Sequence, residues 1–169
     1  MAVNGYLMDT GIAADYFTGH RNVVARVNSL ANPKDLLFIS AITRGEIEFG
    51  HCRTDSTNHE RREEFNRWVR DTFRGRFIVP VTHHTGGYCG DLKAKLFAKN
   101  PPESKKENHP ELGIDQVTGA ALGIDENDLW IASQSIEHNL ILVTADHMDK
   151  IKSIACGLLD DAEDWTQPS

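Results

Sequence analysis

The sequence predicts an α/β protein, a three-layer α/β/α fold around a central parallel sheet of four or five strands. Short apolar runs of strand length alternate along the chain with longer segments whose apolar residues recur at helical spacing. The strand-like runs are apolar at consecutive positions, which is typical of strands buried on both faces. The chain has 169 residues, a length that suits one domain with a substantial core. We therefore expect a single domain over residues 1–169.

The first half of the chain contains two predicted strand-to-helix units. The first strand covers residues 5–8 and leads into a helix, and a second helix over 21–30 ends before Pro33. The second strand covers 36–39, and Ser40 opens the helix that follows it. Two such units in succession favour parallel strands joined by helical crossovers.

The second half continues the alternation but is interrupted once. Residues 100–123 contain three prolines and a run of lysine and glutamate without periodicity, which predicts a long loop or insertion. The elements expected around it are a long amphipathic helix at 57–73, a strand at 77–81, a helix at 85–99, a helix from Asp125 or Asn127 to His138, a strand at 140–144, a short helix or turn at 146–152 and a last edge strand at 154–159.

Four carboxylates fall where predicted strands end and the next helices begin. In an open parallel sheet this edge is where ligands bind. The four are Asp9 at the end of the first strand, Glu46 within two turns of the helix after the second strand, Asp128 in the first turn of a helix, and Asp146 two residues beyond Thr144.

Gathering four carboxylates at one edge is unfavourable unless a cation neutralises them. Oxygen ligands suit Mg²⁺ or Mn²⁺, which can activate a water for in-line attack on a phosphodiester and stabilise the leaving oxygen. Each residue also has a purely structural interpretation. Thr43 and Glu46 match a helix capping box, and the three aspartates suit helix starts or turns. Their joint placement favours the metal site.

Charge and composition restrict the other possibilities. A net charge of −7 counts against general nucleic-acid binding, although residues 60–76 carry six arginines. We interpret these arginines as a solvated helix face rather than a phosphate-binding surface, because acidic residues are interleaved with them. The interleaved residues are Glu60, Glu63, Glu64 and Asp71.

The sequence gives no sign of a disulfide framework, a zinc site or a membrane segment. Its three cysteines are scattered, and His51-Cys52 and His83-His84 have no second pair at zinc-ligand spacing. The N-terminus has no signal-peptide pattern, and no apolar run approaches the length of a membrane span. We therefore expect a cytoplasmic protein without a membrane partner.

Four segments together resemble the PIN domain family, and within it the VapC-like toxins of toxin-antitoxin systems. Tyr6-Leu7-Met8-Asp9-Thr10 is similar to the family's opening strand and aspartate. The next three motifs follow in the family's order, spanning nearly the whole chain. They are Ile39-Ser40-Ala41-Ile42-Thr43-Arg44-Gly45-Glu46-Ile47-Glu48-Phe49-Gly50, Asp125-Glu126-Asn127-Asp128-Leu129-Trp130-Ile131-Ala132 and Leu140-Ile141-Leu142-Val143-Thr144-Ala145-Asp146.

The resemblance implies a specific activity and specific partners. It implies an endoribonuclease for single-stranded or loop RNA, with Mg²⁺ or Mn²⁺ bound mainly by Asp9 and Asp128 and assisted by Glu46 and Asp146. It also implies a homodimer and inhibition by a small cognate antitoxin. The chain departs from the family at Gly11, where Asn or Ser is more common, and in the length of 100–123.

Two other functions stay open at this point. One is a PIN-like RNA-binding or scaffold protein that no longer turns over substrate. The other is a metal-dependent phosphatase of small molecules, although the start lacks a second aspartate two residues after Asp9.

Overall fold

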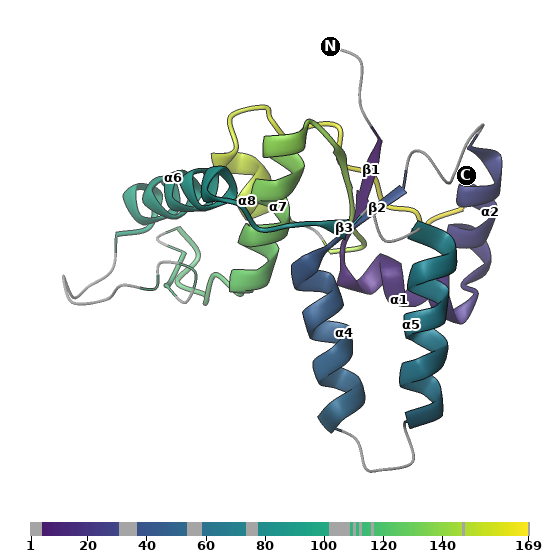
Figure 1. The fold of residues 1–169 in the computed structure, drawn as a ribbon. Helices are drawn as coiled ribbons and strands as arrows, with labels where there is room; N and C mark the ends of the chain where they lie inside the picture. Colours follow the sequence, from purple (N-terminus) through teal and green to yellow (C-terminus); the bar gives the residue numbers. More distant parts are fainter. Residues whose placement is uncertain are drawn as a thin grey trace.

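Four parallel strands form the centre of the molecule (Figure 1). The computed structural model describes residues 5–30, 37–53, 59–73, 78–101, 109, 111, 113–115, 117–146 and 148–168. Within them the strand order is β3-β2-β1-β4, so the chain winds outward in both directions from β1. The strands are β1 (Tyr6–Met8), β2 (Leu37–Ser40), β3 (Ile78–Val79) and β4 (Ile141–Val143). The predicted parallel sheet is confirmed.

Helices cover both faces of the sheet, which confirms the three-layer class. Side chains alternate along β1: Leu7 joins an apolar cluster with α6, α7 and α8, whereas Met8 joins a second cluster with α1, α2 and α5. The helices are α1 (Thr10–Thr18), α2 (Arg21–Ser29), α4 (Ala41–Arg53), α5 (His59–Phe73), α6 (His83–Lys99), α7 (Glu126–His138) and α8 (Asp149–Ile154). None of these described helices is both long and apolar enough to cross a membrane.

The predicted edge strand at 154–159 is wrong. Helix α8 ends at Ile154, and the chain then turns through Cys156 and Gly157, whose φ angles are 53° and 83°. Two successive residues in the left-handed region cannot continue an extended strand. The place beside β4 is taken instead by Glu163, which forms a single parallel bridge with Val143.

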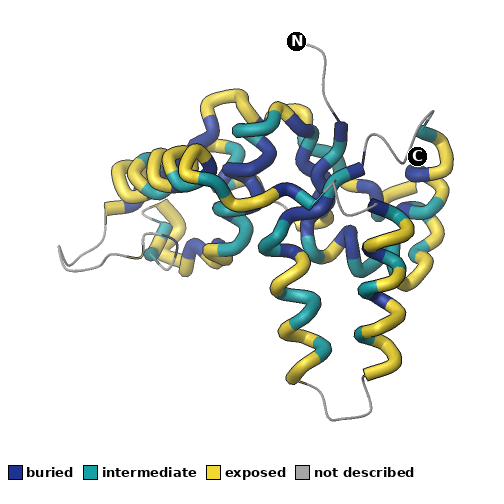
Figure 2. The backbone as a smooth tube through the Cα atoms, in the orientation of Figure 1, coloured by how far each residue is buried: buried dark blue, intermediate teal, exposed yellow. Residues whose placement is uncertain are grey.

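Helices α4 and α5 extend side by side away from the sheet (Figure 1) and become more exposed toward their far ends (Figure 2). At their base, Phe65, Val69 and Phe73 of α5 are buried against the sheet. The other side of each helix carries mostly exposed residues. The pair therefore offers a solvent-facing surface next to the edge where α1, α4 and α7 begin.

The described part of the 100–123 segment folds back on itself. Ile114 and Ala121 form an antiparallel bridge, and Gly119 provides the positive φ of 68° that the turn requires. The Lys150 ammonium of α8 donates a hydrogen bond to the Leu122 carbonyl at 2.6 Å. Residues 102–108 of the predicted insertion lie outside the described residues.

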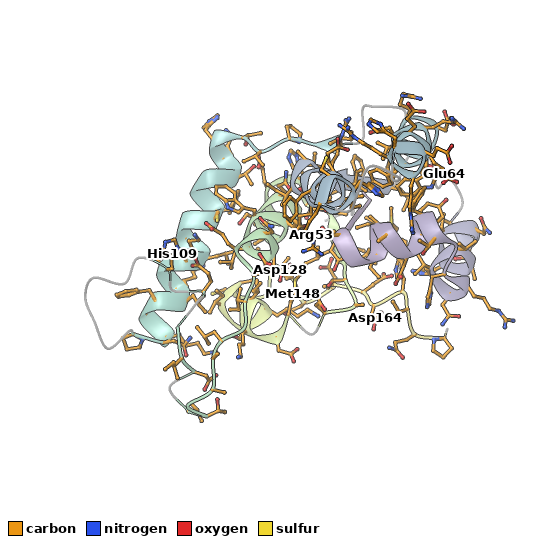
Figure 3. All side chains as sticks on the ribbon, turned by 90° about the horizontal axis from the view of Figure 1, so that it is seen from below. Arg53, Glu64, His109, Asp128, Met148 and Asp164 are labelled. Atoms are coloured by element: carbon orange, nitrogen blue, oxygen red, sulfur yellow. The ribbon has the colours of Figure 1, made fainter. Side chains whose placement is uncertain are left out.

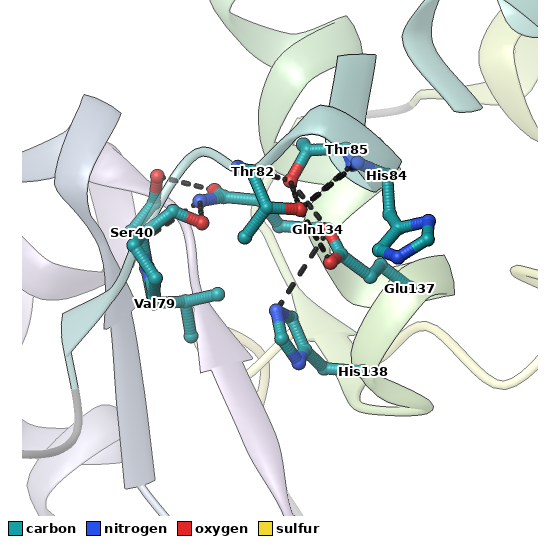
Figure 4. A network of polar contacts seen from close by, with 9 residues as sticks. Ser40, Val79, Thr82, His84, Thr85, Gln134, Glu137 and His138 are labelled. Carbon is teal, nitrogen blue, oxygen red and sulfur yellow. Dashed lines mark hydrogen bonds and ion pairs between the residues drawn. The ribbon is translucent and has the colours of Figure 1, made fainter. Parts of the chain in front are cut away.

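A buried polar network fixes α7 against the sheet (Figure 4). The Gln134 side-chain amide donates to the carbonyls of Val79 at 2.9 Å and Pro80 at 3.0 Å. The Ser40 hydroxyl donates to the Gln134 carbonyl oxygen at 2.5 Å. These bonds join the ends of β2 and β3 to the middle of α7, so the first turn of α7 is held at a defined place above the sheet edge.

Candidate active site

Asp9 lies at the junction of β1 and α1 and is only 4% exposed. Its Oδ1 accepts a hydrogen bond from the Ile12 N–H at 2.7 Å, so it is the N-cap of α1. Burial is the main cause that raises the pKa of Asp9 to about 6. Hydrogen bonds from the Thr144 side chain and the Ile12 N–H act in the opposite direction, and repulsion from Asp146 adds to the rise. The N-cap hydrogen bond is therefore only one of several interactions that act on the Asp9 carboxylate.

Glu46 joins three helices at the same edge. Its Oε2 accepts a hydrogen bond from the Thr10 hydroxyl at the start of α1, and its Oε1 accepts one from the Asn127 amide of α7 at 2.8 Å. The capping-box interpretation of Thr43 and Glu46 is wrong, because α4 begins two residues earlier, at Ala41, where the Ser40 hydroxyl accepts from the Ile42 N–H at 2.8 Å. The Glu46 carboxylate thus contacts α1 and α7 instead of capping its own helix.

Asp128 lies in the first turn of α7, after the N-cap Asp125. Burial is the largest cause that raises the pKa of Asp128 to about 6. Repulsion from four other carboxylates adds to it, in decreasing order Asp125, Asp146, Asp9 and Glu46. Three of these repelling groups are the other carboxylates identified in the sequence, so the structure brings all four into mutual electrostatic range.

Asp146 follows β4 and lies at the same edge as Asp9 and Asp128. Its backbone N–H donates to the Thr144 hydroxyl at 3.0 Å, and its carboxylate repels both Asp9 and Asp128. The backbone N–H of Asp9 donates to the Val143 carbonyl at 3.0 Å, which brings the ends of β1 and β4 together. The sheet register itself therefore places Asp9 beside the turn that carries Asp146.

A cavity of about 540 Å³ opens beside this edge. Seen from below the sheet (Figure 3), Asp128 and Met148, which both line the cavity, lie close together near the centre. One wall comes from the end of the 100–123 insertion, at Leu122 and Gly123. The lining residues are Leu122, Gly123, Ile124, Asp125, Asp128, Asp146, Met148, Asp149, Lys150 and Ile151.

The donor set fits a hard divalent cation. It consists of carboxylate oxygens, two of which belong to groups whose ionised form is disfavoured by burial and repulsion. A divalent cation relieves both the burial cost and the repulsion, and Mg²⁺ needs only one or two direct carboxylate ligands because it keeps several waters. Asn127, Thr10 and Thr144 orient the carboxylates through their hydrogen bonds. The position of Thr144 at a strand end suggested this role from the sequence, whereas no sequence signal identified Thr10 or Asn127.

A second group of metal-ligand type lies in the described part of the chain, and one of its members shares the first turn of α7 with Asp128. Ligand atoms of His109, Glu111 and Glu126 lie within 4.8 Å of one another. The Lys93 ammonium already pairs with both carboxylates, at 2.5 Å from Glu126 Oε1 and 3.8 Å from Glu111 Oε2. We interpret this group as an ion-pair cluster that ties the insertion to α6 and α7.

Comparison with protein families identifies the fold. The PIN domain family matches residues 6–155. The chain belongs to the PIN domain family. PIN domains are generally nucleases and typically bind divalent metals. The sequence matches none of the curated proteins with which it was compared.

Several solved structures share this PIN fold at low sequence identity. A chain in VapBC2 from Rickettsia felis, bound to a DNA fragment from its promoter, is 22% identical with a TM-score of 0.68, covering 95% of this chain and 98% of that one. A chain in VapBC-1 from nontypeable Haemophilus influenzae is 21% identical with a TM-score of 0.61, covering 96% and 98%. A chain in DNA-bound VapBC from Salmonella typhimurium is 16% identical with a TM-score of 0.61, covering 95% and 98%.

Proposed function

We propose that this PIN domain is a Mg²⁺-dependent endoribonuclease that cuts single-stranded or loop RNA, and that it is the toxin of a toxin-antitoxin pair. One observation carries the proposal. Two carboxylates far apart in the sequence, the buried Asp9 and the half-buried Asp128, are both destabilised in their ionised form, and Asp146 repels both of them. Such an arrangement favours a bound cation over an uncompensated cluster of anions.

Each of the four carboxylates has a proposed role. Asp9 and Asp128 would hold Mg²⁺, with Mn²⁺ as the alternative ion, whereas Glu46 and Asp146 would orient its waters. A bound Mg²⁺ lowers the pKa of a coordinated water and neutralises charge on the scissile phosphate. The chain itself keeps the carboxylates in place, because Glu46 is held by Thr10 and Asn127 and Asp9 by the Ile12 N–H.

The proposed partners come from the structural neighbours. The solved structures with this fold include VapBC complexes bound to DNA. We propose by analogy that a small cognate antitoxin inhibits this chain and that the chain forms a homodimer. A neighbouring reading frame whose product co-purifies with the chain would support the antitoxin.

The activity is tested by replacing Asp128 with asparagine. Asp128→Asn is isosteric but removes a charged ligand, so we expect Mg²⁺-stimulated cleavage of single-stranded RNA to fall on the order of a hundredfold or more. The matched control is Glu126→Gln in the same helical turn. Glu126 is 46% exposed and paired with Lys93, so this variant should cleave normally.

Two outcomes would contradict the proposal. Cleavage by Asp128→Asn at the rate of the unaltered chain would show that the site takes no part in the reaction. Alternatively, the unaltered chain binds RNA but shows no cleavage with Mg²⁺ or Mn²⁺ and no change in melting temperature when either ion is added. That result would identify a scaffold protein.

A further inference from the structure

We propose that a groove between α4 and α5 binds the phosphate backbone of the RNA beyond the acidic site; this inference rests on the ribonuclease function proposed above. The groove has a volume of about 650 Å³. We call it the arginine groove and define it by the residues that line it: Arg44, Glu48, Arg62, Glu63, Asn66, Arg67, Val69, Arg70 and Ile78.

The arginine groove is positive although the protein is acidic. Four arginines and two glutamates line it, which leaves a local excess of two positive charges in a chain with a net charge of −7. Phosphate contacts dominate the affinity of proteins for nucleic acids, and an acidic protein repels RNA at long range. A protein of this charge therefore needs a concentrated cationic surface if it is to hold a polyanion.

Three of the four arginines have no acidic partner among the described residues. The sequence suggested that acidic residues interleaved along α5 would neutralise its arginines. In the described residues, however, Arg62 forms an ion pair with Glu48 of α4, and no carboxylate lies within ion-pairing distance of Arg44, Arg67 or Arg70. Unpaired guanidinium groups are well suited to phosphate, because their planar fork of donors can bind two phosphate oxygens at once.

Helix α4 places the arginine groove next to the acidic site. Arg44 and Glu46 are two residues apart, so they lie on nearly opposite sides of α4. Glu46 faces α1 and α7 at the acidic edge, whereas Arg44 lines the groove with α5. A helix with its side chains is about 10 Å across. An RNA strand that leaves the acidic edge and passes over α4 thus reaches the groove within a few nucleotides.

The chemistry of the groove predicts the character of the binding. Guanidinium groups that contact phosphates hold the strand without reading its bases. The exposed arginines lie on the solvent side of α5, opposite the buried Phe65 and Phe73. None of the described residues that line the groove is aromatic, so the described lining favours phosphate contacts over base stacking. Binding in the groove should be sequence-independent and sensitive to salt.

The test measures RNA affinity when cleavage is prevented. The full chain is kept in EDTA and titrated with a fluorescent single-stranded RNA of about fifteen nucleotides, at several salt concentrations. We expect Arg67→Ala/Arg70→Ala to weaken binding about tenfold. The slope of log affinity against log salt should fall by about 1.4, since each contact to a single strand contributes about 0.7. Alanine suits an exposed helical position, so the fold should persist.

The control removes the same charge elsewhere. Arg21→Ala/Lys95→Ala also deletes two positive charges, but from α2 and α6, outside the groove. Equal RNA affinity in the two double variants would overturn the proposal, because net charge alone would then explain the effect. A groove variant that binds RNA normally but loses binding to a polyglutamate peptide would also overturn it, in favour of an acidic protein partner.

The outcome is separable from that of the proposed function. If the arginine substitutions weaken RNA binding but Mg²⁺ never stimulates cleavage, the groove binds RNA and the nuclease proposal fails. If Mg²⁺ stimulates cleavage but the substitutions leave RNA affinity and its salt dependence unchanged, the nuclease proposal stands and the groove proposal fails.

Discussion

Helix α7 carries two carboxylates in opposite electrostatic situations. Glu137, near the end of the helix, accepts hydrogen bonds from the hydroxyls of Thr82, at 2.6 Å, and Thr85. Burial opposes the ionisation of Glu137, but these hydrogen bonds outweigh it and the pKa is lowered (Figure 4). Asp128, two and a half turns earlier, is surrounded by other carboxylates, and its pKa is raised.

The difference supports the proposal that Asp9 and Asp128 are functional carboxylates, whereas Glu137 is structural. The protein completes the environment of Glu137 by itself, because donors from α6 satisfy its oxygens. For Asp9 and Asp128, burial and repulsion by neighbouring carboxylates leave the ionised form disfavoured. A carboxylate that the fold holds in an unfavourable charge state is the better candidate for binding a cation.

The largest expected effect on stability comes from removing Glu137, the carboxylate whose oxygens accept hydrogen bonds from Thr82 and Thr85. Glu137→Ala should lower the free energy of unfolding by about 3 kcal/mol, because two charge-assisted hydrogen bonds are lost and the fully buried Thr85 hydroxyl loses its acceptor. Urea denaturation would measure this loss. The control is Glu64→Ala on α5, an exposed glutamate, which should change stability little. A loss in Glu137→Ala no greater than the control's would show that the network is not structural.

Removing the charge of Asp9, whose ionised form is disfavoured despite its hydrogen bonds, should have the opposite sign. Asp9→Asn keeps the N-cap, since asparagine caps helices as well as aspartate does. In EDTA at pH 7.5 it should raise the free energy of unfolding, on the order of 2 kcal/mol, because a buried and repelled charge is gone.

The pH dependence of Asp9→Asn gives a sharper test. The folded state raises the pKa of Asp9 from 3.8 to about 6 and so binds its proton more tightly than the unfolded state. The stability that protonated Asp9 contributes is complete below pH 4 and is lost as the pH rises through 6. The advantage of Asp9→Asn in EDTA should therefore grow from pH 4 to 7. Added Mg²⁺ should stabilise the unaltered chain more than the variant. An advantage that does not change with pH would contradict this account.

The sequence predicted the sheet and the edge at which the four carboxylates gather, because both depend on local signals. Consecutive apolar residues specify strands such as β4, and the carboxyl ends of parallel strands meet at one edge. The positions of Asp9 and Asp146 beside each other follow from the register of β1 and β4. Their expected role as metal ligands stays a prediction.

Features that depend on contacts between distant segments could not be predicted. The partners of Glu46 are Thr10 and Asn127, which lie 36 and 81 residues away along the chain. Arg62 pairs with Glu48 across the gap between two helices rather than within α5. The left-handed backbone at Cys156 also carries no local signal, because a non-glycine residue rarely adopts it, and this is why the predicted final strand was wrong.

The smallest expected effects come from replacing a helical glycine near each of two carboxylates, Glu137 and Asp9. Gly87 lies inside α6, near the Glu137 network, and an added Cβ there would have no heavy atom within 4 Å. Gly87→Ala should therefore gain about 0.8 kcal/mol in the free energy of unfolding.

Gly11 lies in the first turn of α1, and its added Cβ would lie 3.6 Å from Asp9 Oδ1, an ordinary contact. Gly11→Ala should gain about half as much, because helix propensity matters less at a helix end. Thermal unfolding in EDTA would rank the two variants. A clear loss of stability in Gly11→Ala alone would mean that the turn after Asp9 requires glycine. The presence of Gly11 in place of the family's more common Asn or Ser would then have altered the backbone at the site.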